Sequence, residues 1–363
     1  MANPSDAPVS YPFLWNITQL DYVEWNGIAQ NKSVGFGAAH DFNILGLGRN
    51  TGEVIGVFAD ITITPGVSLT HGYVSSINEP VLVGMEEQLQ TLQPPKWPKE
   101  FPAITQDQAN LGAQLFASKG CADCHTVPNK PFTINDTYKV TLTPIDKSGT
   151  DIWMACNAVL DGTMFEGTKS GAFAGSQLSI VSDQPVGAKS SNLNLVQYAV
   201  FGSLLDKKAD LAATAFEAIL GIDRGLLGPH FYGQVQPKDA RRNACMDALK
   251  NNPDLAKHLV YKARPLQGIW ATAPYLHNGS VANLYELLLP PAQRHEFSTG
   301  SREFDPDKVG YQTDPSADNS FAFKVADPSG KPLDGNANGG HDYGNANITD
   351  PERKALIEYM KTL

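Results

Sequence analysis

Positive charge is scarce in this 363-residue chain, which has 28 Lys and Arg residues against 38 Asp and Glu. The net charge is −10 at pH 7, and the sequence offers no basic stripe that could hold a phosphate backbone. This charge balance excludes nucleic-acid binding, so we expect no nucleic-acid partner.

Long apolar runs are also missing. A membrane-spanning helix needs about 20 consecutive apolar residues, and the nearest candidate, residues 192–205, is interrupted by Gln197 and Gly202. The first eight residues lack both the basic and the apolar region of a secretory signal peptide. We therefore expect no membrane span and no leader within this sequence.

The composition still favours a folded protein, because 42% of the residues are hydrophobic and only 18% are charged. Four prolines surround Trp97 and predict a stiff connector: Pro94, Pro95, Pro98 and Pro102. We place a domain boundary near residue 100. Residues 1–100 then form an aromatic- and glycine-rich N-terminal segment, and residues 101–363 form a second domain.

Cysteine is rare, with four in the chain, but two of them stand in Cys121-Ala122-Asp123-Cys124-His125. This C-x-x-C-H spacing is typical of covalently attached c-type haem. Two thiols one helical turn apart can bond to the two vinyl groups of one porphyrin, and the following imidazole can bind the iron. The motif predicts one covalent haem c, with Cys121, Cys124 and His125 as cofactor-binding residues.

Two other uses of a C-x-x-C pair fit less well. A zinc site needs a second Cys/His pair at short spacing, whereas Cys156 and Cys245 stand apart from each other and from any histidine. A thioredoxin-like pair opens a helix after a strand, whereas this motif follows a predicted helix. For Cys156 and Cys245 we favour a disulfide that closes a loop of about 90 residues, with two buried free thiols as the alternative.

The helix before the motif has a readable pattern. Thr105 and Gln108 have the spacing of a capping box, and one apolar face follows the helical period: Ala109, Gly112, Ala113 and Phe116. Gly112 on that face would let a second helix approach closely. Shorter helical patterns cover residues 81–92, 206–222 and 281–289.

The predicted partner of that helix is at the end of the chain. Thr349 and Glu352 have capping-box spacing, followed by an apolar stripe of Ala355, Leu356, Tyr359, Met360 and Leu363. The first and last helices of a cytochrome c cross in this way. The alternative is two unrelated amphipathic helices at the surface.

The second axial ligand decides whether a haem carries electrons or reacts with oxygen species. In the cytochrome c layout it comes from the loop before the last helix, which here contains Gly339-Gly340-His341-Asp342-Tyr343-Gly344. We expect His341 to bind the iron opposite His125, and Asp342 or a carbonyl to orient its ring. Met360 lies on the apolar stripe and is expected to pack in the core.

His277 is the alternative axial ligand, or a contact to a haem propionate or to a neighbouring cofactor. Arg264 and Lys262 are candidates for pairing with propionates, because a buried carboxylate needs a cation or several donors. A solvated charged face is the alternative for both. The other five histidines are expected to have structural or surface positions: His40, His71, His230, His258 and His295.

A longer stretch resembles a known family. Residues 272–281 (TAPYLHNGSV) and 284–288 (LYELL) resemble the bacterial di-haem cytochrome c peroxidase and MauG superfamily. With the C-x-x-C-H motif, residues 261–266 (YKARPL) and the Gly-His-Asp-Tyr-Gly ending, the resemblance is closest to the branch of the latex-clearing rubber oxygenases. It extends from about residue 11 to the C-terminus.

The resemblance implies a mainly α fold, with cytochrome c-like haem domains and electron transfer between two haems. The composition of residues 298–348, dense in Gly, Asn, Asp, Ser and Pro, separately predicts a long irregular loop that carries His341. The resemblance also implies a bis-histidine C-terminal haem, which matches His125 with His341. In peroxidases of the superfamily, carbonyls at the positions of Thr272 and Pro274 help to bind calcium, so these two residues are a candidate calcium site.

The sequence departs from the family pattern at one point. It has a single C-x-x-C-H motif, and no cysteine precedes it, so we do not expect the oxygen-reactive N-terminal haem domain within this sequence. Since haem c is attached outside the cytoplasm, we expect a periplasmic or secreted protein, either a shortened relative or a chain that begins midway through a longer one.

Three functions remain open on the residues alone. The first is an electron-transferring cytochrome domain with a redox partner protein or a second haem domain. The second is a haem peroxidase or dioxygenase whose iron is open to hydrogen peroxide or oxygen, with a second haem from a missing domain or a partner. The third is a module whose haem is structural.

Overall fold

A computed structural model describes residues 6–31, 34–35, 41–42, 44–68, 72–128, 131–134, 136–159, 170–178, 184–190, 192–206, 238–299, 303–313 and 321–363. This part of the chain is 40% helical and 14% strand. The strands form seven two-stranded sheets among the described residues. The prediction of a mainly α fold is therefore wrong, because short strand pairs are interspersed with the helices along the whole chain.

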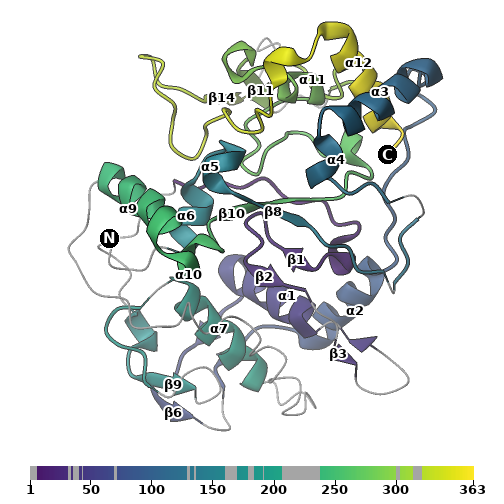
Figure 1. The fold of residues 1–363 in the computed structure, drawn as a ribbon. Helices are drawn as coiled ribbons and strands as arrows, with labels where there is room; N and C mark the ends of the chain where they lie inside the picture. The colour runs from purple at the N-terminus through teal and green to yellow at the C-terminus, as the bar shows by residue number, and fades with distance from the viewer. Residues whose placement is uncertain are drawn as a thin grey trace.

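The upper end of the molecule in Figure 1 holds the two predicted helices, α3 (Gln106–Ser118) and α12 (Asp350–Lys361), packed side by side. The short helix α4 (Cys121–Cys124) follows α3. α11 (Leu284–Leu287) also packs on α12 and is shorter than the predicted 281–289. The Asn283 side chain caps its first turn by accepting from the Glu286 amide, and Pro290 follows its end.

The close approach of α3 and α12 depends on Gly112. A Cβ atom at this position would overlap the backbone carbonyl of Ala355 and crowd the Tyr359 side chain. Around the crossing, the Phe116 and Tyr359 rings lie 5.4 Å apart, and Leu356 and Met360 are buried in the same core. The predicted crossing of the two helices, and the role of Gly112 in it, are confirmed.

Gly112→Ala is expected to lower the free energy of unfolding by about 1–3 kcal/mol, because backbone, which cannot move aside locally, occupies the space of the new methyl group. The matched control is Gly84→Ala in the middle of α2, where a Cβ meets nothing within 4 Å. That variant should be neutral or slightly more stable. Urea unfolding of both variants tests the contact, and equal stability of the two would contradict it.

The two predicted capping boxes have different outcomes. At the start of α12, the Glu352 carboxylate accepts from the Thr349 amide at 2.8 Å and from its hydroxyl at 2.9 Å. At the start of α3, the Thr105 side chain makes no capping bond, and its amide donates instead to Glu358 of α12 at 2.6 Å. The Thr105–Gln108 capping box is therefore wrong, because the neighbouring helix supplies the acceptor.

Glu352 also joins the two helices, since Lys119 lies 3.1 Å from its carboxylate. The Thr349 amide and Lys119 lower its pKa from an ordinary 4.5 to about 2. The stabilisation of the fold by ionised Glu352 is therefore present above pH 4.5 and is lost as the pH falls towards 2. Glu352→Gln should lower the urea midpoint at pH 7, and this difference from wild type should vanish near pH 2. The exposed Glu87→Gln on α2 serves as control, and a pH-independent difference for Glu352→Gln would contradict the account.

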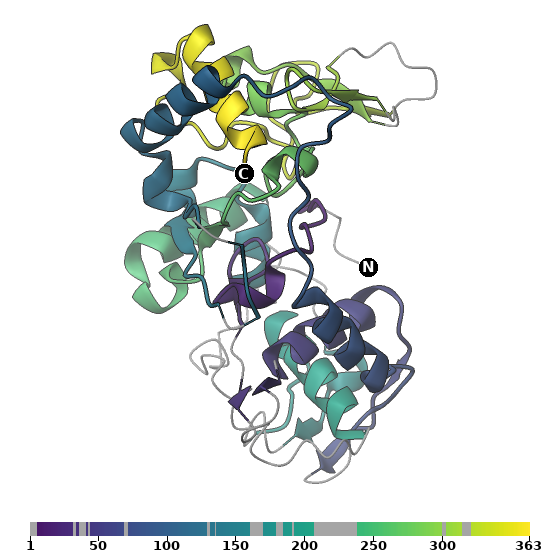
Figure 2. The ribbon, with the colours of Figure 1, turned by 90° about the vertical axis from the view of Figure 1, so that its right-hand side faces the viewer.

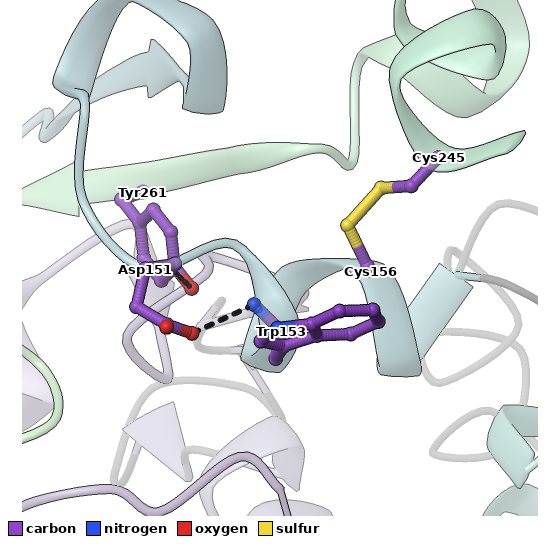
Figure 3. The surroundings of a disulfide bond; sticks show 5 residues. All are labelled: Asp151, Trp153, Cys156, Cys245 and Tyr261. Atoms are coloured by element: carbon purple, nitrogen blue, oxygen red, sulfur yellow. Dashed lines mark hydrogen bonds between the residues drawn. A yellow bond between two sulfur atoms is a disulfide. The ribbon is translucent and has the colours of Figure 1, made fainter. Parts of the chain in front are cut away.

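A second core lies below the first and is built around the antiparallel pair β8 (Thr141–Pro144) and β10 (Val260–Ala263). Its helices are α5 (Ile145–Ser148), α6 (Trp153–Val159), α9 (Lys238–Asn251) and α10 (Pro253–Ala256). Cys156 of α6 and Cys245 of α9 form a disulfide with a Cα–Cα distance of 5.8 Å (Figure 3). The predicted disulfide between these two cysteines is confirmed.

The lower end of the molecule is a helical lobe (Figure 2). It contains α1 (Ile44–Val57), α2 (Glu79–Leu89) and α7 (Asn192–Asp206). α1 packs on both other helices, and the Tyr73 amide donates to Gly202 of α7 at 2.7 Å. The helix predicted over residues 81–92 is thus confirmed as α2. Residues 192–206 pack here against the N-terminal segment, although they lie beyond the predicted domain boundary near residue 100. That boundary stays a prediction.

The remaining elements are short. The strand pairs are β1 (Tyr22–Val23) with β2 (Ala29–Gln30), β3 (Val34–Gly35) with β4 (Asp41–Phe42), β5 (Ile61–Thr62) with β7 (Val74–Ser75), β6 (Gly66–Ser68) with β9 (Ser176–Leu178), β11 (Phe297–Thr299) with β14 (Phe321–Phe323), and β12 (Phe304–Asp305) with β13 (Gly310–Tyr311). Single 3-10 turns are η1 (Ile17–Gln19), η2 (Gly171–Phe173), η4 (Ile269–Ala271), η5 (Pro291–Gln293) and η6 (Asn345–Asn347).

Two further predictions have different outcomes. The helix predicted over residues 206–222 falls almost entirely outside the described residues. Within the described residues, no helix is both long and apolar enough to span a bilayer, which agrees with the sequence.

Candidate haem-binding site

A cavity of about 440 Å³ lies between the two cores. Its walls come from α4, β10, η4, α11 and α12, together with the loop before α12 and residues 10–13 of the N-terminal segment. Most of the lining is apolar, including Phe116, Leu266, Leu284, Leu288, Leu356 and Met360. A concave, largely apolar cavity with a small number of polar groups is typical of a cofactor site.

The C-x-x-C-H motif forms one wall of this cavity. Cys121 and Cys124 begin and end α4, both thiols are free and half-buried, and both residues line the cavity. Gly120 supplies the positive φ of 81° that turns the chain from α3 into α4. Free thiols one turn apart on a cavity wall are what thioether attachment to a porphyrin requires.

His125 follows α4 and projects into the cavity. Its Nδ1 lies 2.8 Å from the carbonyl oxygen of Arg264, to which it can donate. This bond leaves Nε2 for the cavity, the arrangement usual for a metal-ligating histidine. Burial lowers the pKa of the imidazole, although the Arg264 carbonyl opposes this shift. His125 is therefore neutral at pH 7, the form that binds metals.

His341 lies across the cavity from His125, with ring centres 6.1 Å apart. It has a left-handed backbone with φ of 61°, and its amide donates to Ser148 at 3.0 Å. Gly340 must be glycine, because a Cβ there would overlap Thr150. Burial, with smaller contributions from His125 and Arg294, lowers the pKa of His341 to about 3, so this ring is also neutral.

The spacing of the two rings fits an iron atom between them. Metal–nitrogen bonds of about 2 Å on both sides place the two ring centres about 6 Å apart, and the observed distance is 6.1 Å. The Nδ1 of His341 is buried and makes no hydrogen bond to another residue of the described structure. The hydrogen bond expected from Asp342 is not formed, and the backbone contact that raises the pKa of the ring comes from His341 itself.

The other candidate ligands are engaged elsewhere. His277 lines the cavity, but its Nε2 lies 3.2 Å from the Tyr261 hydroxyl and its Nδ1 lies 3.5 Å from that of Thr150. Its ring stacks on Tyr261, and burial lowers its pKa to about 3. Met360 is packed in the core, as expected.

Among the five remaining histidines, His295 is exposed and pairs with Glu286 at 3.0 Å. His258 is half-buried just after α10. His40, His71 and His230 lie outside the described residues.

Arg264, which is buried, and Lys262, which is half-buried, bring two basic side chains to the cavity wall. Desolvation lowers the pKa of Lys262 well below its ordinary value. The Arg264 guanidinium donates to the carbonyls of Phe13 and Trp15 at 3.2–3.3 Å and lies 3.4 Å from the centre of the Phe13 ring. Its Nε is buried without a partner among the described residues, and burial lowers its pKa to about 9. A buried cation without a carboxylate beside it suits an anionic group such as a haem propionate.

Thr272 and Pro274 also line the cavity, next to η4. Calcium prefers six to eight oxygen ligands that include carboxylates. Within the described part of the chain, no group of three or more His, Cys, Asp or Glu side chains is placed to hold a metal ion. The candidate calcium site at Thr272 and Pro274 stays a prediction.

Sequence reasoning missed two residues around the site. Tyr343 is half-exposed, lines the cavity and meets His341 edge-on at 5.2 Å. Arg294 donates hydrogen bonds from its guanidinium to backbone carbonyls of two segments beside the site. Tyr343 follows His341 by two positions and could have been noticed, whereas no pattern marks an arginine that binds carbonyls.

Comparison with known proteins agrees with this geometry. Residues 260–298 match the family model of RoxA-like, cytochrome c-like domains. The chain contains a cytochrome c-like segment. The matched residues run from β10, beside His125, to β11, and they include Arg264, His277 and Arg294. A cytochrome c-like domain implies haem c as its cofactor and an iron centre.

Two similar proteins come from Sinorhizobium fredii, and both are described as uncharacterized. Protein y4iJ is 28% identical over 385 residues, which cover 98% of this chain and 55% of that protein. Protein y4iM is 39% identical over 119 residues, 28% of this chain and 27% of that protein. The chain thus spans about half the length, or less, of these relatives.

Proposed function

We propose that this chain is a c-type cytochrome domain that binds one haem covalently and passes electrons. Cys121 and Cys124 would hold the porphyrin, and His125 and His341 would bind the iron from opposite faces. The observation that carries the proposal is the pair of neutral imidazoles facing each other at 6.1 Å across the cavity. Haem, when bound, supplies a one-electron couple.

The residues around the site favour electron transfer with little rearrangement. With both histidines bound to it, the iron would be suited to electron transfer, and two imidazole ligands would favour a potential below that of a His/Met haem. The Arg264 carbonyl fixes the ring of His125 at 2.8 Å, and Arg264 and Lys262 offer positive charge to the propionates. The largely apolar lining of the cavity suits the porphyrin ring.

The proposed partner is a redox protein or a second haem domain. The RoxA-like, cytochrome c-like match supports an extracytoplasmic, periplasmic or secreted, location. The relationship to the C-terminal half of di-haem peroxidase-like enzymes is part of the same proposal. It is supported by the match of residues 260–298 to the RoxA-like, cytochrome c-like family model.

The experiment that tests electron transfer uses the purified protein with its haem. We expect a low-spin bis-histidine spectrum, a reversible one-electron couple, no spectral change on adding hydrogen peroxide, and a spectral change with cyanide only at concentrations high enough to displace His341. A high-spin ferric signal that responds to either ligand would instead support a peroxidase or dioxygenase. A haem without a reversible couple would support a structural role.

A further inference from the structure

The two proposed axial histidines are held by different means. The His125 ring is oriented by a hydrogen bond from its own Nδ1 to the Arg264 carbonyl at 2.8 Å. The Nδ1 of His341 is buried and makes no hydrogen bond to another residue of the described structure. A ring without such a bond must take its position from the backbone that carries it and from its neighbours.

The backbone before His341 is attached to a buried arginine. Arg294 donates from one terminal nitrogen to the carbonyls of Asn338 and Gly340, the latter at 2.7 Å. Its other nitrogens donate to carbonyls at the end of α11, namely Leu287 at 3.0 Å, Glu286 at 3.1 Å and Leu289 at 3.3 Å. One guanidinium therefore joins the end of α11 to the two residues that lead into His341.

Asn345 makes a second attachment on the other side of His341. Its side-chain nitrogen donates to the Leu287 and Leu289 carbonyls at 3.1 Å and to the His341 carbonyl at 3.2 Å. Asn345 is buried, as is Arg294. The loop is thus fixed to the same carbonyls of α11 before and after the histidine.

Arg294 is not placed to contact the cofactor, since its three nitrogens all donate to backbone carbonyls and it is not among the cavity-lining residues. We propose that Arg294 is a positioning residue for the second axial ligand: it sets where the His341 imidazole lies by joining the loop of residues 338–340 to α11. The inference rests on the proposed function, in which His341 binds the iron.

The test compares Arg294→Gln with Arg353→Gln in the full chain, expressed with the machinery that attaches haem c. Arg353 is a matched control, because it is also buried and donates to the carbonyls of Leu288 and Ile348 but not to the loop before His341. Asn345→Ala is a second variant that weakens the same loop from its other side. Each protein is titrated with cyanide, and exchange of the backbone amides of residues 338–345 is measured.

Arg294→Gln should keep its covalent haem but bind cyanide about 10- to 100-fold more tightly than wild type, because the displaced ligand is held less well. Asn345→Ala should change cyanide affinity in the same direction, and Arg294→Lys should lie between wild type and Arg294→Gln. The loop amides should exchange faster in Arg294→Gln, whereas Arg353→Gln should retain the wild-type cyanide affinity. If Arg294→Gln does not fold, Asn345→Ala and Arg294→Lys carry the test.

Two results separate failure of this inference from failure of the proposed function. Wild-type cyanide affinity in both Arg294→Gln and Asn345→Ala, with a high-spin spectrum in His341→Ala, would overturn the positioning role and leave the haem ligands in place. An unchanged low-spin spectrum in His341→Ala would reject His341 as a ligand, and the positioning role with it. An equal increase in Arg353→Gln would show a general effect of destabilisation and would also overturn the inference.

Discussion

His341→Ala is expected to convert the bound haem from a low-spin, six-coordinate state to a high-spin state that binds cyanide. The variant removes the imidazole that faces His125 at 6.1 Å. The other histidine of the cavity cannot replace it without giving up its contacts to Tyr261 and Thr150. Loss of one strong axial ligand should change the coordination of nearly every haem rather than of a fraction.

The matched control is His277→Ala, which removes a buried histidine from the wall of the same cavity. This variant should keep the wild-type low-spin spectrum, although it leaves the Tyr261 hydroxyl and Thr150 with fewer partners. Imidazole added to His341→Ala should restore the low-spin spectrum, since it fills the vacated position. If His277→Ala turns high-spin and His341→Ala does not, the two assignments must be exchanged.

Removing the disulfide has the second large expected effect. The double variant Cys156→Ser with Cys245→Ser should lower the free energy of unfolding by about 2–5 kcal/mol, because the bond closes a loop with a sequence separation of 89 in the unfolded chain. Both cysteines are fully buried beside Trp153, the largest side chain of the second core. The hydroxyl groups of the variant would add to the loss.

Urea unfolding monitored by tryptophan fluorescence measures this effect in the presence and absence of a reducing agent. Wild-type protein should become as unstable as the double variant when it is reduced, and the double variant should not respond. The denatured, unreduced wild type, with its haem attached, should contain no titratable thiol. Two reactive thiols in that state, or equal stability of wild type and double variant, would refute the bond.

The site could be predicted from sequence to the extent that its residues stand in local patterns. The C-x-x-C-H spacing marked one side, and the Gly-Gly-His stretch before the last helix marked the other. The structure brings these two regions together. The crossing of α3 and α12 was predictable for the same reason, since helical periodicity and Gly112 are visible within one turn or two.

The strands could not be predicted because most are too short to show alternation. The pairs β1–β2 and β12–β13 contain two residues in each strand, and a period of two cannot be read from two residues. β8 and β10 contain four residues each but pair across more than 100 positions. Their partner is fixed by tertiary packing, so the prediction of a mainly α fold omitted them.

The helical lobe at the lower end could not be predicted from the sequence for a related reason. Its contacts join α1 and α2 to α7, which is far away in sequence. The close contact of Gly202 with Tyr73 has no local signature in either segment. Arg294 could not be identified from the sequence for the same reason. Its proposed role depends on hydrogen bonds to backbone carbonyls, which every residue carries, so no residue pattern marks it.

The account depends most directly on one covalent haem in this chain. The decisive measurement is the intact mass of the purified protein together with its haem content from the pyridine hemochrome spectrum, after expression with competent maturation machinery. The account predicts a mass increased by one haem and one haem per chain, with both lost in Cys121→Ala with Cys124→Ala. A colourless wild-type protein whose mass equals that of its amino acids alone would contradict it.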